Sequence, residues 1–102
     1  SGVSFLPATL ARPTVLQNRP NPFNPTTRIG FGLPAAGAAR LAIYSLEGRL
    51  VRTLADRDFP AGYSELTWDG RGDDGAPQPS GVYFYRFEAG GVVETKRLVM
   101  SK

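Results

Sequence analysis

Hydrophobic and polar residues alternate along several short segments of this chain. In TRIGFGL, residues 27–33, the apolar side chains of Ile29, Phe31 and Leu33 stand at every second position. A period of two is typical of a β-strand that presents one face to a core and the other to solvent. The pattern therefore predicts a half-buried strand over these residues.

The same alternation recurs in ARLAIYS, residues 39–45. It places Leu41 and Ile43 on the expected core face of a strand, and Ala42 and Tyr44 on the opposite face. This segment is also the best helix candidate in the chain, but strand formers dominate it and a glycine follows closely. We therefore expect a strand.

A tight turn should follow this second strand. In LEGR, residues 46–49, Gly48 can take a positive φ, and LVRTL, residues 50–54, resumes a strand-like composition. The two strands are expected to form a hairpin.

A further strand is predicted over GYSELTW, residues 62–68, with Leu66 and Trp68 on one face. The segment that follows, DGRGDDGAPQPSG, is so rich in Asp, Gly and Pro that it fits neither a helix nor a strand. We expect a long polar loop over residues 69–81.

The last part of the chain reads as a second hairpin. In VYFYRFEA, residues 82–89, Tyr83, Tyr85 and Phe87 share one face. Gly90-Gly91 suits a two-residue turn in which both residues have φ > 0. The returning strand should be VVETKRLVM, residues 92–100, with Leu98 and Met100 directed inward.

No segment has the apolar spacing of a stable helix. Short strands separated by turn signals in about one hundred residues predict an all-β fold, namely an immunoglobulin-like antiparallel β-sandwich of about seven strands with an extended N-terminal arm. The absence of cysteine excludes the variety with a bridging disulfide. We expect residues 1–15 to form the arm or a linker, and residues 16–102 to form the sandwich.

The stretch QNRPNPFNPTTRIGFGLP, residues 17–34, precedes and includes the first predicted strand. Its prolines fix φ and bias the residues before them toward extended angles, so the segment should form a stiff corner. Asparagine side chains can bond backbone groups that no strand partner reaches. Phe23, the large apolar residue of the run, is expected to plug the end of the sandwich.

Composition narrows the possible functions. With no His and no Cys among its 102 residues, the chain lacks the ligands of usual zinc and haem sites and cannot form a Ser-His-Asp triad or a Cys-His pair. Its Glu residues show no paired spacing suited to glycoside hydrolysis. We expect no enzyme activity, no catalytic residue and no cofactor.

The net charge of +3 comes from scattered arginines, many of them beside an acid, so nucleic-acid binding is not favoured. No apolar run approaches the roughly 20 residues that a membrane-spanning helix needs. We expect neither a nucleic-acid partner nor a membrane-spanning segment.

Several motifs occur together and in order: the Asn-Pro-Phe-Asn-Pro run, the Trp-Asp-Gly sequence, the Ser-Gly-Val-Tyr sequence, and TKRLVM beside the C-terminus. Over residues 16–102 the chain resembles the type A C-terminal sorting domain of type IX secretion, which is similar to the immunoglobulin-like domain of the flagellar hook-capping protein. The positions that match the motifs are Asn21, Pro22, Phe23, Asn24, Pro25, Gly48, Trp68, Gly81, Tyr83, Tyr85 and the segment from residue 96 to residue 102.

This resemblance implies a non-enzymatic, extracellular or cell-surface bacterial module. In the family, such a module follows a larger cargo, is read by the outer-membrane secretion machinery, and is often removed or exchanged for a surface anchor. The partner would thus be secretion machinery or a surface anchor. The resemblance implies contacts through the last strand, by Lys96, Arg97, Leu98, Val99 and Met100.

The N-terminal arm suggests an alternative. Val3, Phe5 and Leu6 are apolar, and Pro7 and Pro13 prevent a long helix. The arm is either a linker or a donor strand that pairs with the sheet edge of an identical subunit. In the second case the protein would be a self-assembling structural subunit of an extracellular filament or surface layer.

The long polar loop contains two smaller candidate sites. Asp69, Asp73 and Asp74 gather oxygen ligands in one loop and are weak calcium candidates, since the loop lacks the spacing of an EF-hand. The tripeptide RGD, residues 71–73, spells an integrin ligand but is favoured as turn chemistry.

A carbohydrate-binding accessory domain is a third possible function. Trp68, Tyr83 and Tyr85 could stack on a sugar, but their strand faces favour the core. The aromatic residues expected to be exposed, Tyr44, Tyr63 and Phe84, are better candidates, although they are dispersed in the sequence.

Overall fold

A computed structural model describes residues 12–22 and 26–101 of the chain. Seven strands occur in this part of the chain, and no helix. The strands are β1 (Thr14–Val15), β2 (Thr27–Leu33), β3 (Gly37–Ser45), β4 (Leu50–Phe59), β5 (Gly62–Trp68), β6 (Gly81–Ala89) and β7 (Val92–Met100). No helix in the described residues is long and apolar enough to cross a membrane.

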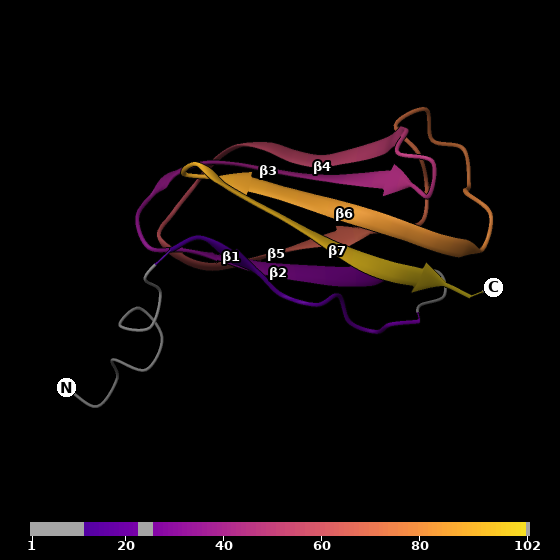
Figure 1. The fold of residues 1–102 in the computed structure, drawn as a ribbon, viewed down its shortest axis with the longest axis horizontal. Helices are drawn as coiled ribbons and strands as arrows, with labels where there is room; N and C mark the ends of the chain where they lie inside the picture. The colour runs from indigo at the N-terminus through magenta and orange to yellow at the C-terminus, as the bar shows by residue number, and fades with distance from the viewer. Residues whose placement is uncertain (1–11, 23–25, 102) are drawn as a thin grey trace.

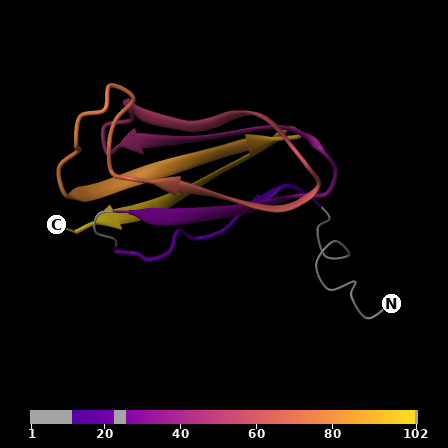
Figure 2. The same ribbon diagram turned by 180° about the vertical axis from the view of Figure 1, so that it is seen from behind.

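The strands form two antiparallel sheets packed face to face. One sheet has the order β1-β2-β5 and the other the order β4-β3-β6-β7. Figure 1 shows β1 and β2 below β3, β4 and β6, and Figure 2 shows β5 from the other side. The predicted all-β, antiparallel sandwich is thereby confirmed. The first strand, Thr14–Val15, lies on the arm side of the boundary expected at residue 16.

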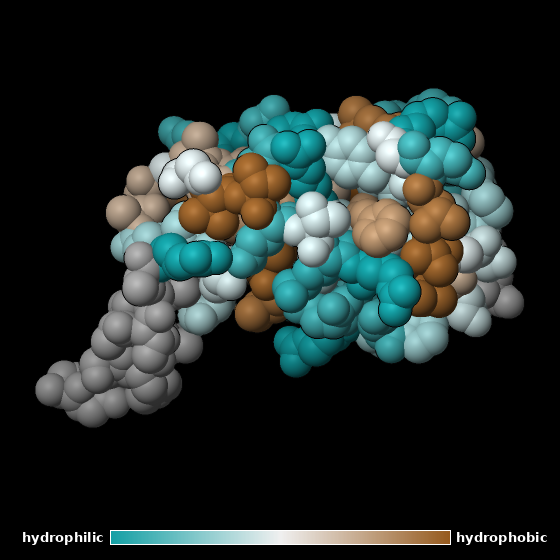
Figure 3. Space-filling view, viewed as in Figure 1, coloured by the Kyte–Doolittle hydropathy of each residue, from teal (hydrophilic) through white to brown (hydrophobic). Residues whose placement is uncertain are grey.

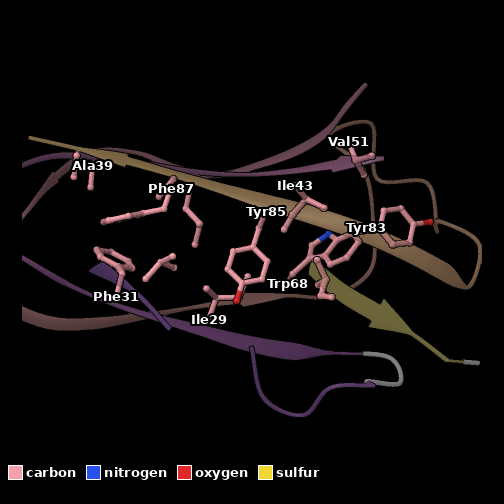
Figure 4. Close-up of a cluster of buried hydrophobic side chains, with 14 of the residues drawn as sticks. Ile29, Phe31, Ala39, Ile43, Val51, Trp68, Tyr83, Tyr85 and Phe87 are labelled. Carbon is pink, nitrogen blue, oxygen red and sulfur yellow. The ribbon is translucent and has the colours of Figure 1, made fainter. Parts of the chain in front are cut away.

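The core lies between the two sheets and follows the predicted alternation. Apolar side chains from β2, β3 and β6 meet there, as Figure 4 shows. The ring of Phe31 on β2 packs edge-on against Phe59 of β4, with 4.9 Å between ring centroids. It also packs against the ring of Phe87 on β6 in a tilted arrangement, with 5.3 Å between centroids. Burial at about 25 cal/mol per Å² makes this core the main source of stability. Most predicted core residues are buried, namely Ile29, Phe31, Leu33, Leu41, Ile43, Trp68, Tyr83, Tyr85, Phe87, Leu98 and Met100. Leu66, which was expected on the same face as Trp68, packs against the core but is only partly buried.

Both predicted hairpins are present. Gly90 and Gly91 turn between β6 and β7 with φ of 54° and 81°, as the two-glycine signal predicts. Gly48 takes φ of 90° in the turn between β3 and β4.

Strand β4 extends to Phe59, five residues beyond the expected end at residue 54. Register shifts between Leu41 and Ala42 and between Ile43 and Tyr44 mark irregularities in its pairing with β3. Each irregularity adds a residue to β4 and shifts its inward set, so the sequence of this strand lacks a clean alternation.

Ala42 differs from its expected exposure. It occupies the outer face as predicted, yet it is fully buried. Its cross-strand neighbours are Thr53 on β4 and Arg86 on β6, and these longer side chains cover the small methyl group.

Candidate functional site

The segment between β1 and β2 is bound to the core by a buried hydroxyl. The side chain of Tyr85 crosses from β6 toward the three-stranded sheet (Figure 4), where its hydroxyl donates to the Leu16 carbonyl oxygen at 2.6 Å. The Tyr85 hydroxyl oxygen also accepts a hydrogen bond from the Asn18 backbone N–H at 3.0 Å. Tyr85 therefore satisfies two backbone groups that no strand partner reaches.

Asn18 is itself almost completely buried and extends this network. Its side-chain amide donates to the Pro20 carbonyl at 3.1 Å and to the Thr27 hydroxyl at 3.0 Å, and its oxygen accepts from Gln17 at 2.6 Å. The Thr27 hydroxyl donates in turn to the Pro20 carbonyl at 2.9 Å. The stiff corner predicted before β2 is thus fixed by side chains. The peptide bonds before Pro20 and Pro22 are cis.

This network makes the domain sensitive to alkaline pH. Burial is the main cause that raises the pKa of Tyr85 from 10.0 to about 12, and the hydrogen bond from Asn18 opposes it in part. Below pH 10 the phenol is neutral in both states. As pH rises from 10 toward 12 the unfolded chain loses the proton first, so stability falls, by about 1.4 kcal/mol per unit.

We expect the stability advantage of the wild type over Tyr85→Phe to be constant up to about pH 9 and to shrink between pH 10 and 12. Urea unfolding of both proteins across this range measures it. The comparison removes the titration of other groups, because both chains carry them. An advantage that stays constant to pH 12 would contradict the assigned cause.

The same segment covers one edge of the four-stranded sheet. The Gln17 side chain donates to the Arg97 carbonyl at 2.8 Å, and the Asn21 side-chain oxygen accepts from the Val99 N–H at 3.0 Å. Side chains thus bond the outer edge of β7, where a further strand would otherwise pair. For Asn21, a residue of the matched motif, the distant strand β7 supplies the partner.

Of the five residues expected to contact a partner on β7, two are inaccessible. Leu98 and Met100 are buried in the core, so in the folded domain they cannot touch another protein. Lys96 and Val99 are partly exposed and Arg97 is exposed. The accessible part of β7 therefore consists of these three side chains.

Trp68 and Tyr83 hold the long loop between β5 and β6. The indole N–H of Trp68 donates to the Arg71 carbonyl at 2.8 Å, and the hydroxyl of Tyr83 donates to the Pro79 carbonyl at 2.5 Å. The rings of Trp68 and Tyr83 pack edge to face, with 5.3 Å between their centroids. Both residues are buried, and so is Tyr85, which confirms their expected core position. Gly81 begins β6 with φ of 145°.

The three loop aspartates are engaged by backbone amides. Asp69 accepts from Arg71 N, Asp73 from Thr53 N, and Asp74 from Ala76 N. Arg52 also lies 3.6 Å from Asp69 and 3.9 Å from Asp73. Among the described residues, no group of three His, Cys, Asp or Glu side chains could hold a metal ion.

The RGD sequence lies inside this folded loop. Gly72 is buried, and a Cβ there would lie 2.9 Å from the Gln78 amide nitrogen and 3.3 Å from the Val51 carbonyl oxygen. The flanking Arg71 and Asp73 bond within the loop and to β4. These contacts give the tripeptide a role in loop packing.

Two of the aromatic residues considered dispersed are brought together by the sheet. Tyr44 on β3 and Phe84 on β6 are direct cross-strand partners, and both are partly exposed on the outer face. Tyr63 lies apart, on β5 of the other sheet. This pair could not be predicted from the sequence, because forty residues separate its members and only the register of β3 with β6 brings them together.

The remaining candidates lie outside the described residues. Phe23, Asn24 and Pro25 of the motif belong to this group, and so does the plug predicted for Phe23. Val3, Phe5 and Leu6 of the arm are also outside it. Their expected roles stay predictions.

Comparisons with known proteins show which family and which solved structures this domain resembles. Residues 18–95 match the family model of the FlgD Ig-like domain. Among solved structures, the chain is similar to dimeric latent PorU from Porphyromonas gingivalis, with a TM-score of 0.70 and 19% identity over 90% of this chain and 10% of PorU. It is also similar to PorZ of that bacterium, with a TM-score of 0.57 and 21% identity over 84% of this chain and 11% of PorZ. No curated protein matches the chain.

At these identities the solved structures support the fold alone, and the chain spans about a tenth of the length of each. The family model, in contrast, covers most of the sandwich, from Asn18 in the buried network to Thr95 on the last strand. The chain therefore belongs to the FlgD Ig-like domain family.

Proposed function

We propose that this chain is a sorting or anchoring module of a secreted bacterial protein and acts at the cell surface without catalysis. Membership of the FlgD Ig-like domain family supports a binding module rather than an enzyme. The likeness to PorU, and to PorZ, which is described as an essential bacterial surface component of the type-IX secretion system, supports a link to that system.

The observation that carries the proposal is a pair of adjacent cations, Lys96 and Arg97, on β7, the edge strand of the four-stranded sheet. Lys96 and Arg97 are accessible, and none of the ion pairs found among the described residues involves either of them. Their charges are free to attract an acidic surface of the secretion machinery, and complementary charge increases the rate of association. Val99 adds a small apolar contact beside them.

A fusion experiment tests the sorting role. The chain is attached to the C-terminus of a fluorescent reporter that carries an export signal, and the fusion is produced in a bacterium with an active type IX system and in a matched strain without it. We expect the reporter on the cell surface or in the medium only in the competent strain. Equal amounts outside both strains, or none outside either, would contradict the proposal.

Charge-reversal variants in the same export experiment test the role of β7. We expect Lys96→Glu/Arg97→Glu to reduce export at least several-fold while the domain stays folded, because Arg97 is exposed and Lys96 is partly exposed. The control Arg28→Glu/Arg49→Glu changes the net charge by the same amount at exposed sites elsewhere. Equal export of the two variants would show that β7 is not the recognised surface.

A further inference from the structure

The outer face of the four-stranded sheet contains a hollow of about 420 Å³ beside the Tyr44–Phe84 pair. Leu46, Arg86 and Thr95 complete most of its wall. Its volume falls within the range of about 300 to 1,000 Å³ that is usual for small-ligand sites. Figure 3 shows the side of the molecule seen in Figure 1, where hydrophobic groups lie separately within a hydrophilic surface.

The phenol of Tyr44 is held in place by a charged network. Arg40 Nη1 donates to the Tyr44 hydroxyl oxygen at 3.1 Å. Arg40 is positioned in turn by Asp56, with 3.8 Å between Nε and Oδ2, and by Glu88, with 3.9 Å between Nη1 and Oε2. An aromatic ring fixed in this way loses little freedom when a ligand stacks on it.

The charges around the ring pair nearly cancel. Arg86 Nε lies 2.9 Å from Glu88 Oε2, so the two arginines beside the pair, Arg40 and Arg86, face two acids, Glu88 and Asp56. Arg97, the cross-strand partner of Phe84 on β7, adds one further positive charge. A phosphate-bearing ligand would need several unpaired cations gathered together, whereas this balance suits an uncharged one.

We propose that Tyr44 and Phe84 form a binding platform for a neutral sugar ring of a polysaccharide. The C–H groups on the apolar face of a pyranose would stack on the two rings, whose faces carry partial negative charge. Its hydroxyls would meet the Thr95 hydroxyl, the Arg86 guanidinium and the Tyr44 hydroxyl at the rim. The hollow adjoins β7 through Thr95 and through Arg97, the cross-strand partner of Phe84. The sugar-binding role is nevertheless tested separately from the sorting role, because Tyr44 and Phe84 lie on β3 and β6 and neither is changed in the export variants.

Binding is measured on the intact chain in two ways. Native gels cast with neutral polysaccharides (β-glucan, xylan, galactomannan) reveal retarded migration, and ¹H–¹⁵N spectra titrated with the hexasaccharides of cellulose, xylan, mannan and chitin reveal the site. We expect retardation by at least one polysaccharide and shifts confined to residues around Tyr44, Phe84 and Thr95. The spectra test the site on the wild type, so they do not depend on any variant folding.

Variants of the two aromatic residues then test how much each side chain contributes to binding. We expect Phe84→Ala and Tyr44→Ala to weaken binding about tenfold or more. Phe84→Tyr should retain binding, since a tyrosine ring keeps the stacking face. The control Tyr63→Ala removes an exposed aromatic residue from the other sheet and should bind like the wild type. Thermal unfolding of each variant checks that it is folded.

Four results would overturn the proposal, and the first three concern the neutral probes and the Phe84→Ala variant. They are the absence of retardation and of shifts with all the neutral probes, shifts located elsewhere on the domain, and undiminished binding by folded Phe84→Ala. Binding only to acidic polysaccharides, such as alginate, with loss at high salt would also overturn it, because the ligand would then be recognised by charge.

Discussion

Replacing Trp68 by alanine should cost about 3 to 5 kcal/mol of folding free energy, the range typical of large aromatic residues truncated in cores. Trp68 is fully buried, and its loss leaves a cavity beside the ring of Tyr83. It also removes the donor that bonds the Arg71 carbonyl. In a domain whose total stability is of order 5 to 15 kcal/mol, this is a large fraction.

Chemical unfolding followed by circular dichroism measures the effect, since Trp68 is the sole tryptophan and its fluorescence disappears with it. Tyr63→Ala, in the same strand but exposed, is the matched control and should change stability by less than about 1 kcal/mol. Trp68→Phe keeps most of the packing and loses the indole N–H, so it should fall between the two. Similar losses for Trp68→Ala and Tyr63→Ala would contradict the core assignment.

The second large effect is expected for Asn18→Ala, at about 2 to 4 kcal/mol. The change removes three side-chain hydrogen bonds at a buried site and leaves the Pro20 carbonyl with the Thr27 hydroxyl as its remaining partner in this network. Each such bond contributes about 1 kcal/mol, and an unsatisfied buried group costs more. The Asn18 backbone N–H can still bond Tyr85, so the corner before β2 would lose its side-chain bond to Thr27 but keep its backbone bond to the core.

Thermal and urea unfolding compare this variant with Gln17→Ala, whose exposed side chain should cost about 1 kcal/mol or less. The double variant Asn18→Ala/Thr27→Val should lose less than the sum of the two single losses, because both side chains share one network. Strict additivity, or a loss below about 0.5 kcal/mol for Asn18→Ala, would show that the network contributes little.

The local alternation of apolar and polar residues was sufficient to predict most strands. Side chains in an antiparallel sheet alternate between faces, so the run of Ile29, Phe31 and Leu33 predicted both the strand and its buried side. The same reasoning failed along β4, because its irregular pairing with β3 alters the inward register. The two-glycine turn at Gly90 was recognisable for a different reason, since few other residues tolerate positive φ.

The hydrogen bonds of the candidate site join residues that are far apart in the sequence. The local alternation of apolar and polar residues could not predict these partners. Asparagine side chains of the corner were expected to bond unpaired backbone groups, and Asn21 does so with Val99, seventy-eight positions away, a partner that the local sequence does not indicate. Tyr85 was correctly placed in the core by its strand face, but its hydrogen bonds with Leu16 and Asn18 follow from how the two sheets pack. A buried tyrosine hydroxyl needs a partner, and this is the signal that could have suggested the contact.

The network around Asn18 also determines how the domain would bear a mechanical load. Tension applied to the N-terminal side of β1 acts first on a strand of two residues, which alone could resist little. The next bonds in line are those of Leu16 with Gly30 and of Asn18 with Tyr85, and the latter lead directly into the four-stranded sheet. A pull on this end would therefore be shared by both sheets at once, and the sandwich would yield as a unit rather than peel apart strand by strand.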